Sequence, residues 1–180
     1  VFEKIKPLLI PMYGRQIHDL DGTTRLLPYG NAGQFINSVS RSELNKILIT
    51  ESEQTGNIRF FFQHVCTGLE KDTHTLNFHD IQTNTKLNVN HSPVIAADGS
   101  GSIIRRFFHQ TGDLLDEMKP LEHSYKELNI PPDNFGQYQL DPNALHIWPR
   151  GRYMLIALPN MDKSFTCTLF MPNDGETRTS

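Results

Sequence analysis

The sequence predicts an α+β fold, in which an α/β portion is joined to a sheet of mixed or antiparallel strands. Three observations predict it. A helix signal over residues 40–56 is followed by a strand-like segment at 58–66, which is the order of an α/β layer. Strand-like segments with short turns end the chain, which is typical of a sheet meander; they are 145–148, 152–158 and 164–170. The hydrophobic fraction of 37% is enough to build a core.

The first part of the chain is expected to form a β-hairpin. Residues 12–20 and 23–27 are predicted strands, and Asp21-Gly22 between them is a favourable two-residue turn. Arg15 and Tyr29 lie at the two ends of this hairpin, so we expect them side by side. Residues 1–9 are compatible with either a helix end or a lead-in strand.

A helix is predicted to begin at Ser40. Residues 40–43 form a capping box, in which the Ser40 side chain caps the helix start and Glu43 reaches back to it. Gly56 is a natural stop. The apolar residues between them recur at helical spacing and indicate one buried face; they are Leu44, Ile47 and Leu48.

Further strands are predicted in the middle of the chain. In two of them apolar and polar residues alternate, which is typical of a strand with one exposed face. Pro131-Pro132 ends the last strand before the terminal meander. The predicted segments are 58–66, 73–80, 85–90 and 122–130.

The segment 94–109 is predicted as a strand, a turn and a helix. Residues 94–97 are apolar in a row, as a strand covered on both faces requires. Asp98-Gly99 then forms a sharp turn, and Ser100 or Ser102 can cap the helix that follows. By itself, Asp-Gly between a strand and a helix usually indicates only a turn.

The composition excludes several classes of function. A net charge of −3 and a pI near 6.2 give no electrostatic basis for binding nucleic acid or an anionic membrane. No apolar run approaches the roughly 20 residues needed to span a bilayer. Cys66 and Cys167 are isolated thiols, which favours a reduced, cytoplasmic protein without a disulfide framework. The eight histidines form no ligand cluster, so no metal site is expected.

The strand-turn-helix segment also resembles a longer motif. Asp98, Gly99, Ser102 and Arg105 match the D-G-x-x-S-x-x-R pattern of FAD-dependent aromatic hydroxylases of the p-hydroxybenzoate hydroxylase class. Several segments, in order and over nearly the whole chain, resemble the kynurenine 3-monooxygenase family. They are PMYGRQIHDL, LPYG, INSVSRSELNKIL, YKELNIPP, LHIWPRGRYMLIALPN and DKSFTCTLFMP.

This resemblance implies a flavoprotein fold and an aromatic hydroxylation. The fold would be p-hydroxybenzoate hydroxylase-like but incomplete, because the family's G-x-G-x-x-G unit and its C-terminal part are missing from this sequence. The implied reaction converts L-kynurenine to 3-hydroxykynurenine with FAD as cofactor, NADPH as co-substrate and O2, in tryptophan catabolism and NAD biosynthesis. The isolated chain is expected to be inactive and to bind FAD weakly at most.

The resemblance also divides the chain by function. Residues 1–35 would form a hairpin that carries the groups for the substrate carboxylate. Residues 36–112 would form part of an FAD-binding domain, and residues 113–180 part of a substrate-binding sheet domain. No catalytic side chain is expected, because the flavin carries the chemistry.

Arg15 and Tyr29 are the predicted carboxylate-binding residues. A guanidinium binds a carboxylate through two parallel hydrogen bonds, and the resemblance assigns this role to Arg15 and a donated hydroxyl to Tyr29. Met154, Ile156 and Leu158 alternate along one predicted strand, so they share a face that could hold an aromatic ring. Phe165 and Ile36 complete the predicted substrate site. The cofactor-binding residues that the resemblance implies are Arg41, Cys66, Asp98, Gly99, Ser102 and Arg105.

The residues alone are compatible with two other functions. The first is a flavin hydroxylase that acts on another aromatic acid. The second is a non-catalytic sheet module that binds small carboxylates through Arg15. For the individual residues the alternatives are a surface arginine at position 15 and ordinary sheet core at the apolar positions.

Overall fold

The computed structural model describes residues 1–90, 93–115 and 117–173. Two compact units make up the chain. The first combines residues 1–57 with residues 120–180, and the second comprises residues 58–119. Each unit is described by itself.

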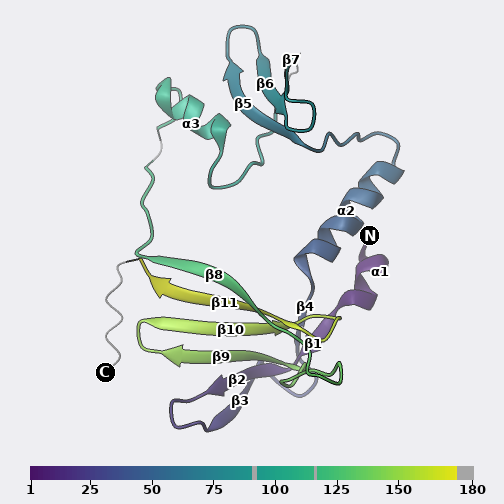
Figure 1. Cartoon of the computed structure of the whole chain (residues 1–180), viewed down its shortest axis with the longest axis vertical. Coiled ribbons are helices and arrows are strands. Elements are labelled where there is room, and N and C mark those ends of the chain that lie inside the picture. The colour runs from purple at the N-terminus through teal and green to yellow at the C-terminus, as the bar shows by residue number, and fades with distance from the viewer. Residues whose placement is uncertain (91–92, 116, 174–180) are drawn as a thin grey trace. The chain divides into compact units, whose positions relative to one another are not determined.

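A mixed six-stranded sheet forms the centre of the first unit (Figure 1). Its strand order is β3-β2-β9-β10-β11-β8. Neighbouring strands are antiparallel except β2 and β9, which run parallel. The strands are β2 (Gly14–His18), β3 (Thr24–Pro28), β8 (His123–Ile130), β9 (Ala144–Arg150), β10 (Tyr153–Pro159) and β11 (Phe165–Pro172).

The two faces of this sheet differ in burial. Directly opposed residues on neighbouring strands project from the same face, and successive residues of one strand project from opposite faces. His146, Ala157 and Cys167 are opposed in this way and are all buried. We call their side the core face; Tyr138 and Leu140 pack against it. The other side, which carries Arg15, is called the open face.

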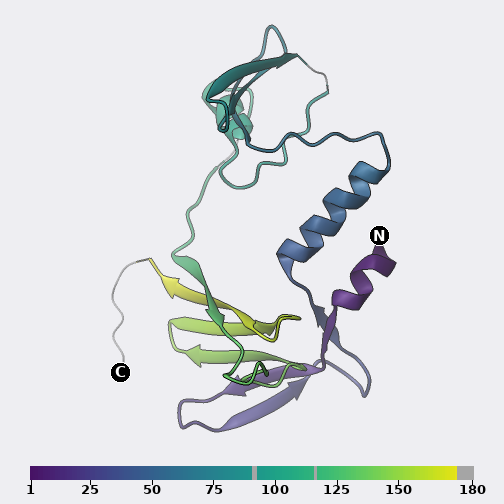
Figure 2. The same cartoon turned by 45° about the vertical axis from the view of Figure 1, so that its right-hand side comes forward.

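A short ribbon and two helical segments complete the first unit. β1 (Ile10–Met12) pairs antiparallel with β4 (Ile36–Ser38). The buried Ser38 hydroxyl donates a hydrogen bond to the carbonyl of Pro159 at the end of β10 (2.9 Å). α2 (Arg41–Gln54) follows β4, and α1 (Phe2–Ile5), continued by the 3₁₀ turn Lys6–Leu8, lies beside it (Figure 2).

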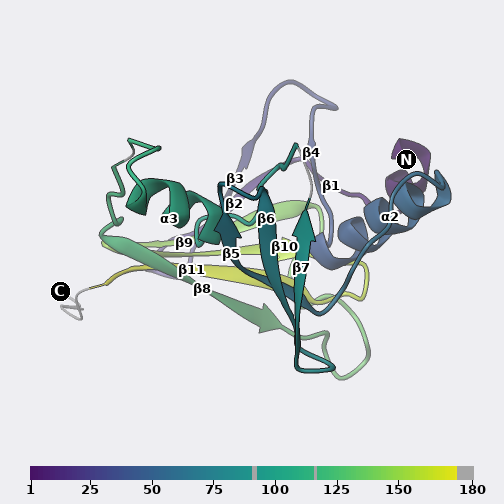
Figure 3. The ribbon, with the colours of Figure 1, turned by 90° about the horizontal axis from the view of Figure 1, so that it is seen from above.

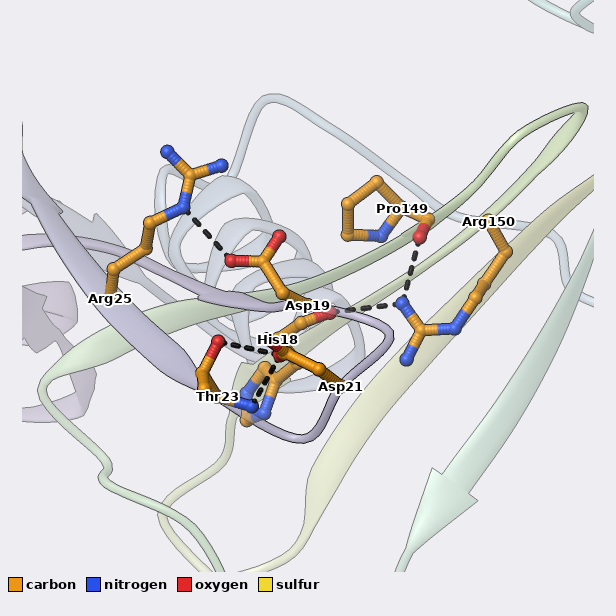
Figure 4. Close-up of polar contacts among 7 residues, drawn as sticks. All are labelled: His18, Asp19, Asp21, Thr23, Arg25, Pro149 and Arg150. Carbon is orange, nitrogen blue, oxygen red and sulfur yellow. Dashed lines mark hydrogen bonds and ion pairs between the residues drawn. The ribbon is translucent and has the colours of Figure 1, made fainter.

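The β2–β3 hairpin turns through residues 19–23 (Figure 4). The Asp21 carboxylate accepts hydrogen bonds from the backbone N–H (2.9 Å) and the hydroxyl (2.7 Å) of Thr23. These bonds hold the pKa of Asp21 below its usual value. The Asp19 carboxylate, at the start of the turn, pairs with the Arg25 guanidinium on β3 (3.0 Å). The turn chemistry therefore fixes the hairpin register, in which Gly14 is opposite Pro28.

The second unit is a three-stranded antiparallel sheet with one helix (Figure 3). The helix contacts β5, and Leu76 on the central strand is buried. The elements are β5 (His64–Glu70), β6 (Thr75–Asp80), β7 (Thr85–Asn90) and α3 (Ile103–Gln110). None of the helices in the described part of the chain has the length and hydropathy that crossing a bilayer requires.

Most predicted elements are confirmed within a few residues. The hairpin, both predicted helices, the strand at 122–130 and the terminal meander all form. Ser40 caps α2 by accepting the Glu43 backbone N–H (3.5 Å), and Ser102, not Ser100, caps α3. The first residues are helical, which decides between the two alternatives for 1–9.

Two predicted strands need correction. Residues 58–63 are irregular, and β5 begins only at His64, after Gln63 adopts a positive φ of 63°. Residues 94–97 form no strand, and Ile95 is 90% exposed. A short apolar run becomes a buried strand only when another strand pairs with it, and no described strand pairs with these residues.

The two compact units divide the chain at positions other than the borders of the three predicted functional regions. Strands from residues 14–28 and residues 123–172 share one sheet. The division into 1–35, 36–112 and 113–180 concerns function, and it stays a prediction.

Candidate functional site

Arg15 and Tyr29 lie side by side on the open face of the six-stranded sheet. Arg15 is on β2, and Tyr29 follows β3 directly. The guanidinium carbon of Arg15 is 5.4 Å from the centre of the Tyr29 ring, over its face, where a cation is attracted by the ring. The expected proximity of these two residues is confirmed. Arg15 is exposed, so its five donors can reach a ligand.

The close approach of the two strands here depends on a glycine. Gly14 precedes Arg15 and is buried. A Cβ atom on Gly14 would lie 2.7 Å from the Leu27 carbonyl oxygen and 3.1 Å from its carbonyl carbon. Both are backbone atoms of β3, so a larger residue would push β3 away. The absence of a side chain at position 14 therefore brings Tyr29 within reach of Arg15.

The Tyr29 hydroxyl is buried and has no hydrogen-bond partner among the described residues. Burial raises the pKa of Tyr29, and the nearby Arg15 charge opposes this only in part. The hydroxyl therefore stays protonated at neutral pH and can donate a hydrogen bond. Buried polar groups are nearly always paired in native proteins, and an unpaired hydroxyl beside a guanidinium is suited to donate to an acidic acceptor.

Apolar side chains continue the open face away from Arg15. Leu145 of β9 is the register partner of Arg15, and Ile156 of β10 is opposite Ile147 of β9. Since Ala157 lies on the core face, its neighbours Ile156 and Leu158 lie on the open face, as does Met154. Leu158 is two strands from Arg15, roughly 10 Å between Cα atoms. The expectation that Met154, Ile156 and Leu158 share a face is confirmed, and Arg15 shares it.

Phe165 requires a correction. It is opposite Pro159 and projects from the core face, where it is fully buried. Its ring packs edge-on against His146 and Tyr138, with ring centres 5.6 Å apart in both cases. The aromatic residue of β11 on the open face is instead Phe170, which is directly opposite Met154. Phe165 and Phe170 are five positions apart in the strand, an odd number, so the strand's alternation puts them on opposite faces.

The sequence alone could not distinguish these two phenylalanines. The choice depends on which residues of β10 and β11 are opposed, and that register is set by the geometry of the turn at 160–164. Ile36 is also placed apart from this sheet. It pairs with Met12 in the β1–β4 ribbon and is 44% exposed.

A cavity of about 500 Å³ opens between the start of α2 and the open face. It brings together Arg41, predicted for the cofactor, and Leu158, predicted for the substrate. Its walls are mainly polar side chains, together with the start of α2, which Ser40 caps at the Glu43 N–H. The N–H groups at a helix start favour anions. The lining residues are Ser38, Val39, Ser40, Arg41, Ser42, Asn45, Glu127, Leu158, Asn160, Thr166 and Thr168.

In the second unit, the residues of the D-G-x-x-S-x-x-R motif meet at the start of α3. The Asp98 carboxylate accepts the backbone N–H of Ile103 (3.0 Å) and bonds to the Ser102 side chain, which holds the pKa of Asp98 below its usual value. The Ser102 hydroxyl accepts the Arg105 backbone N–H (3.0 Å). Gly99 has a φ of +77°, which favours glycine. The side chains of the motif thus hydrogen-bond to one another and to the nearby backbone, and together they form a turn before a helix.

Cys66 lies on β5 of the second unit and is half-buried. A β-bulge interrupts the pairing with β6 between Cys66 and Gly68. The thiol points to the Gly68 carbonyl, with Sγ and O 3.7 Å apart. In the described parts of the chain, no group of three or more His, Cys, Asp or Glu side chains could hold a metal ion.

The structure also brings together two histidines that the sequence leaves far apart. His18 Nε2 and His146 Nδ1 are 2.9 Å apart on the core face of β2 and β9. His146 Nε2 donates to the Asp141 carbonyl (2.8 Å), so its Nδ1 accepts from His18. Burial lowers the pKa of both rings. Figure 4 shows Arg150 nearby, which donates to the His18 carbonyl (2.9 Å) and further keeps the His18 pKa low.

Comparison with solved structures defines the class of fold. The chain superposes on a geranylgeranyl bacteriochlorophyll reductase-like protein from Thermoplasma acidophilum (TM-score 0.68, 14% identity, 93% of this chain and 42% of that one). It also superposes on the myxobacterial chondrochloren halogenase, a variant of FAD-dependent halogenases (TM-score 0.65, 11% identity, 96% and 40%). The fold is therefore the α+β fold of FAD-dependent monooxygenases, halogenases and reductases. No protein-family model matches the chain.

Sequence comparison identifies the relatives within this class. The chain is 46% identical to the kynurenine 3-monooxygenase of Cytophaga hutchinsonii over 169 residues, which are 94% of this chain and 37% of the relative. It is 40% identical to the enzyme of Sus scrofa over 163 residues (91% and 34%). The chain is thus homologous to a part of kynurenine 3-monooxygenase, and the resemblance predicted from its motifs is confirmed. It spans little more than a third of the length of these relatives.

Proposed function

We propose that the protein containing this chain is an FAD-dependent monooxygenase that hydroxylates L-kynurenine to 3-hydroxykynurenine with NADPH and O2. The observation that carries the proposal is the buried, unpaired Tyr29 hydroxyl beside the Arg15 guanidinium, on the face that carries Ile156 and Leu158. A ligand that satisfies this face has an acid group at one end and an apolar ring at the other. Kynurenine, which gives the sequence relatives their name, has both.

Arg15 and Tyr29 would bind the α-carboxylate. The guanidinium would donate two parallel hydrogen bonds, which fix the direction of the carboxylate as well as its position. The Tyr29 hydroxyl would donate a third and gain the partner that it lacks. Because the hydroxyl is already desolvated, this bond costs little further loss of hydration.

The apolar part of the open face would hold the aromatic ring. Ile156, Leu158 and Met154 offer a continuous apolar strand face, and Phe170 opposite Met154 adds an aromatic surface. Arg15 and Leu158 are two strands apart, roughly 10 Å between Cα atoms, so the acid group and the ring would bind over different strands of the same face. These side chains would orient the ring and exclude water from it. Ile36 remains a candidate at the rim.

Residues of each unit offer groups suited to a part of FAD. In the first, Arg41 supplies a cation and the start of α2 supplies N–H groups at a polar cavity that Glu127 also lines, and such groups can hold a pyrophosphate. In the second, we assign Cys66, Asp98, Gly99, Ser102 and Arg105 to cofactor contacts by homology. Bound FAD would supply the redox chemistry that activates O2. The side chains of this chain would bind and orient, and no catalytic side chain or metal is proposed.

The proposal places the protein in the cytoplasm, as the isolated thiols of Cys66 and Cys167 favour. Its partners would be the substrate, NADPH and O2, without nucleic acid. Because the chain spans little more than a third of its relatives, activity belongs to the complete gene product. We expect the 180 residues alone to be inactive.

The test is kynurenine-stimulated NADPH oxidation by the complete gene product, with 3-hydroxykynurenine identified as the product. Arg15→Ala should weaken kynurenine binding by about 2–4 kcal/mol, because it removes one partner of a desolvated charged hydrogen bond. An unchanged KM in Arg15→Ala would remove Arg15 from the site.

Two other functions predict different results. A flavin hydroxylase of another aromatic acid would oxidise NADPH faster with a different member of a panel of aromatic acids. A non-catalytic module that binds carboxylates through Arg15 would show no flavin absorbance and no NADPH oxidation in the complete gene product.

A further inference from the structure

Asn143 joins two segments that build the carboxylate site. It lies in the turn just before β9, and its backbone carbonyl accepts the N–H of Tyr13 (2.8 Å). Its side-chain amide donates to the carbonyl of Pro11 (2.8 Å). Asn143 therefore holds both Pro11 of β1 and Tyr13, the single residue between β1 and β2, and Tyr13 lies two residues before Arg15.

The same contacts reach Tyr29. The Tyr13 carbonyl accepts the backbone N–H of Tyr29 (3.1 Å), so Tyr29 is one hydrogen bond from the segment that Asn143 holds. The parallel pairing of β2 with β9 begins at the next residue, with Gly14 opposite Ala144 and Arg15 opposite Leu145. Asn143 thus lies where the placement of both carboxylate-binding residues is set.

The turn that carries Asn143 is itself anchored in the core. The Asn143 backbone N–H donates to the Asp141 carboxylate (2.8 Å). The Asp141 carbonyl in turn accepts from Nε2 of His146 (2.8 Å), whose ring is 2% exposed. The position of Asn143 is therefore fixed from the core face, while the segment that it holds leads to the open face.

We propose that Asn143 is a positioning residue for the carboxylate site formed by Arg15 and Tyr29. This inference rests on the proposed function. Asn143 acts through the backbone of residues 11–13, and it sets the guanidinium and the phenol hydroxyl at the spacing that a carboxylate needs. A site held in the binding geometry pays less to order its side chains when the ligand arrives. The effect of Asn143 therefore lies in substrate binding, and turnover of bound substrate does not depend on it.

The test compares Asn143→Asp with the wild-type complete gene product. Aspartate has the same shape, but it removes the donor and places a carboxylate oxygen against the Pro11 carbonyl. We expect the KM for kynurenine to rise about five- to tenfold, as the loss of one such bond does, with kcat within about twofold. Asn173→Asp is the matched control, since Asn173 donates to the Leu121 carbonyl (2.8 Å) elsewhere on the sheet; its KM should stay unchanged.

A double-mutant cycle separates positioning from general damage to the fold. In a background that carries both Arg15→Ala and Tyr29→Phe, kcat/KM should no longer respond to Asn143→Asp, because both groups that it positions are gone. A full five- to tenfold loss in that background would overturn the proposal, and so would an unchanged KM in the single variant. If Asn143→Asp does not fold, Asn143→Ser replaces it in the test. Serine keeps a donor on a shorter side chain, so the KM should rise in this variant too, but by less. A wild-type protein without kynurenine-stimulated NADPH oxidation would instead refute the proposed function.

Discussion

At the scale of single residues, the Tyr29 hydroxyl differs from that of Tyr138, which is also half-buried. Tyr138 donates to the Asn160 carbonyl (2.6 Å), and Tyr29 has no partner among the described residues. A buried hydroxyl without a partner costs about 1–3 kcal/mol of stability. Proteins tolerate such a cost at positions where a ligand later supplies the missing acceptor.

This contrast predicts that replacing tyrosine by phenylalanine has different effects on stability and on KM at the two positions. Tyr29→Phe should leave the free energy of unfolding unchanged or raise it by up to about 1 kcal/mol, because it removes an unpaired group. It should also raise the KM for kynurenine in the complete gene product about fivefold. Tyr138→Phe should lower the free energy of unfolding by about 1 kcal/mol and leave KM unchanged. Urea unfolding and steady-state kinetics measure both; a destabilised Tyr29→Phe would contradict the assignment.

Two phenylalanines of β11 give a second prediction at this scale. Phe165→Ala should lower the free energy of unfolding by about 3–5 kcal/mol, because it leaves a cavity on the core face. Phe170→Ala should cost less stability and should raise the KM for kynurenine, because Phe170 lies beside Met154 on the open face. If Phe170→Ala leaves KM unchanged, the ring does not rest on this part of the sheet.

At the scale of elements, local chemistry predicts the secondary structure well. Ser40 and Ser102 begin helices, and Asp21-Gly22 turns the hairpin, as expected from side chains that bond to their own backbone. Local chemistry does not predict which distant strands pair. Residues 94–97 have the composition of a buried strand, but no described strand pairs with them. Composition alone does not specify a partner.

The same limit applies to the candidate site. The proximity of Arg15 and Tyr29 is predictable, because one hairpin carries both. The side of the sheet on which Phe165 lies is not, because a shift of one residue in register exchanges the two faces. The contact of His18 with His146 joins residues 128 apart in the sequence, and only the parallel pairing of β2 with β9 brings them together.

The histidine pair makes the stability of the six-stranded sheet depend on pH. Burial lowers the pKa of both rings in the folded state. The unfolded chain therefore binds more protons as the pH falls below about 6.5, and stability falls with it. The carboxylates with lowered pKa, such as Asp21 and Asp98, stay ionised in this range and lose their contribution only under stronger acid.

We expect the urea midpoint of the chain to be lower at pH 5.5 than at pH 7.5. His146→Gln should reduce this difference, because the glutamine amide does not titrate. His123→Gln, which changes an exposed histidine of β8, is the control and should leave the difference as it is. An equal reduction in both variants would show that the buried pair is not the cause.

At the scale of the whole molecule, the chain is homologous to part of an enzyme, and its fold is that of a flavoprotein class. Its sequence contains no G-x-G-x-x-G loop, the feature that brings a helix start to a dinucleotide pyrophosphate. The proposed carboxylate site of Arg15 and Tyr29 nevertheless lies entirely in the first unit of this chain.

We therefore predict that FAD binding needs sequence beyond this chain, whereas the proposed carboxylate site does not. The 180-residue chain, mixed with FAD and filtered, should retain no stoichiometric flavin absorbance, whereas the purified complete gene product should be yellow. Bound flavin in the isolated chain at a ratio near one to one would show that residues 1–180 hold the cofactor without further sequence.

The parallel pairing of β2 with β9 has a consequence for synthesis on the ribosome. Residues 14–17 align with residues 144–147, so the strand that carries the arginine emerges well before its neighbour exists. Contacts between such distant segments form late and slowly. Until then the edge of β2 that later pairs with β9 is unpaired, and nascent chains are most exposed to mispairing during this interval. The open face that carries Arg15 is therefore completed only after residues 144–147 have been synthesised.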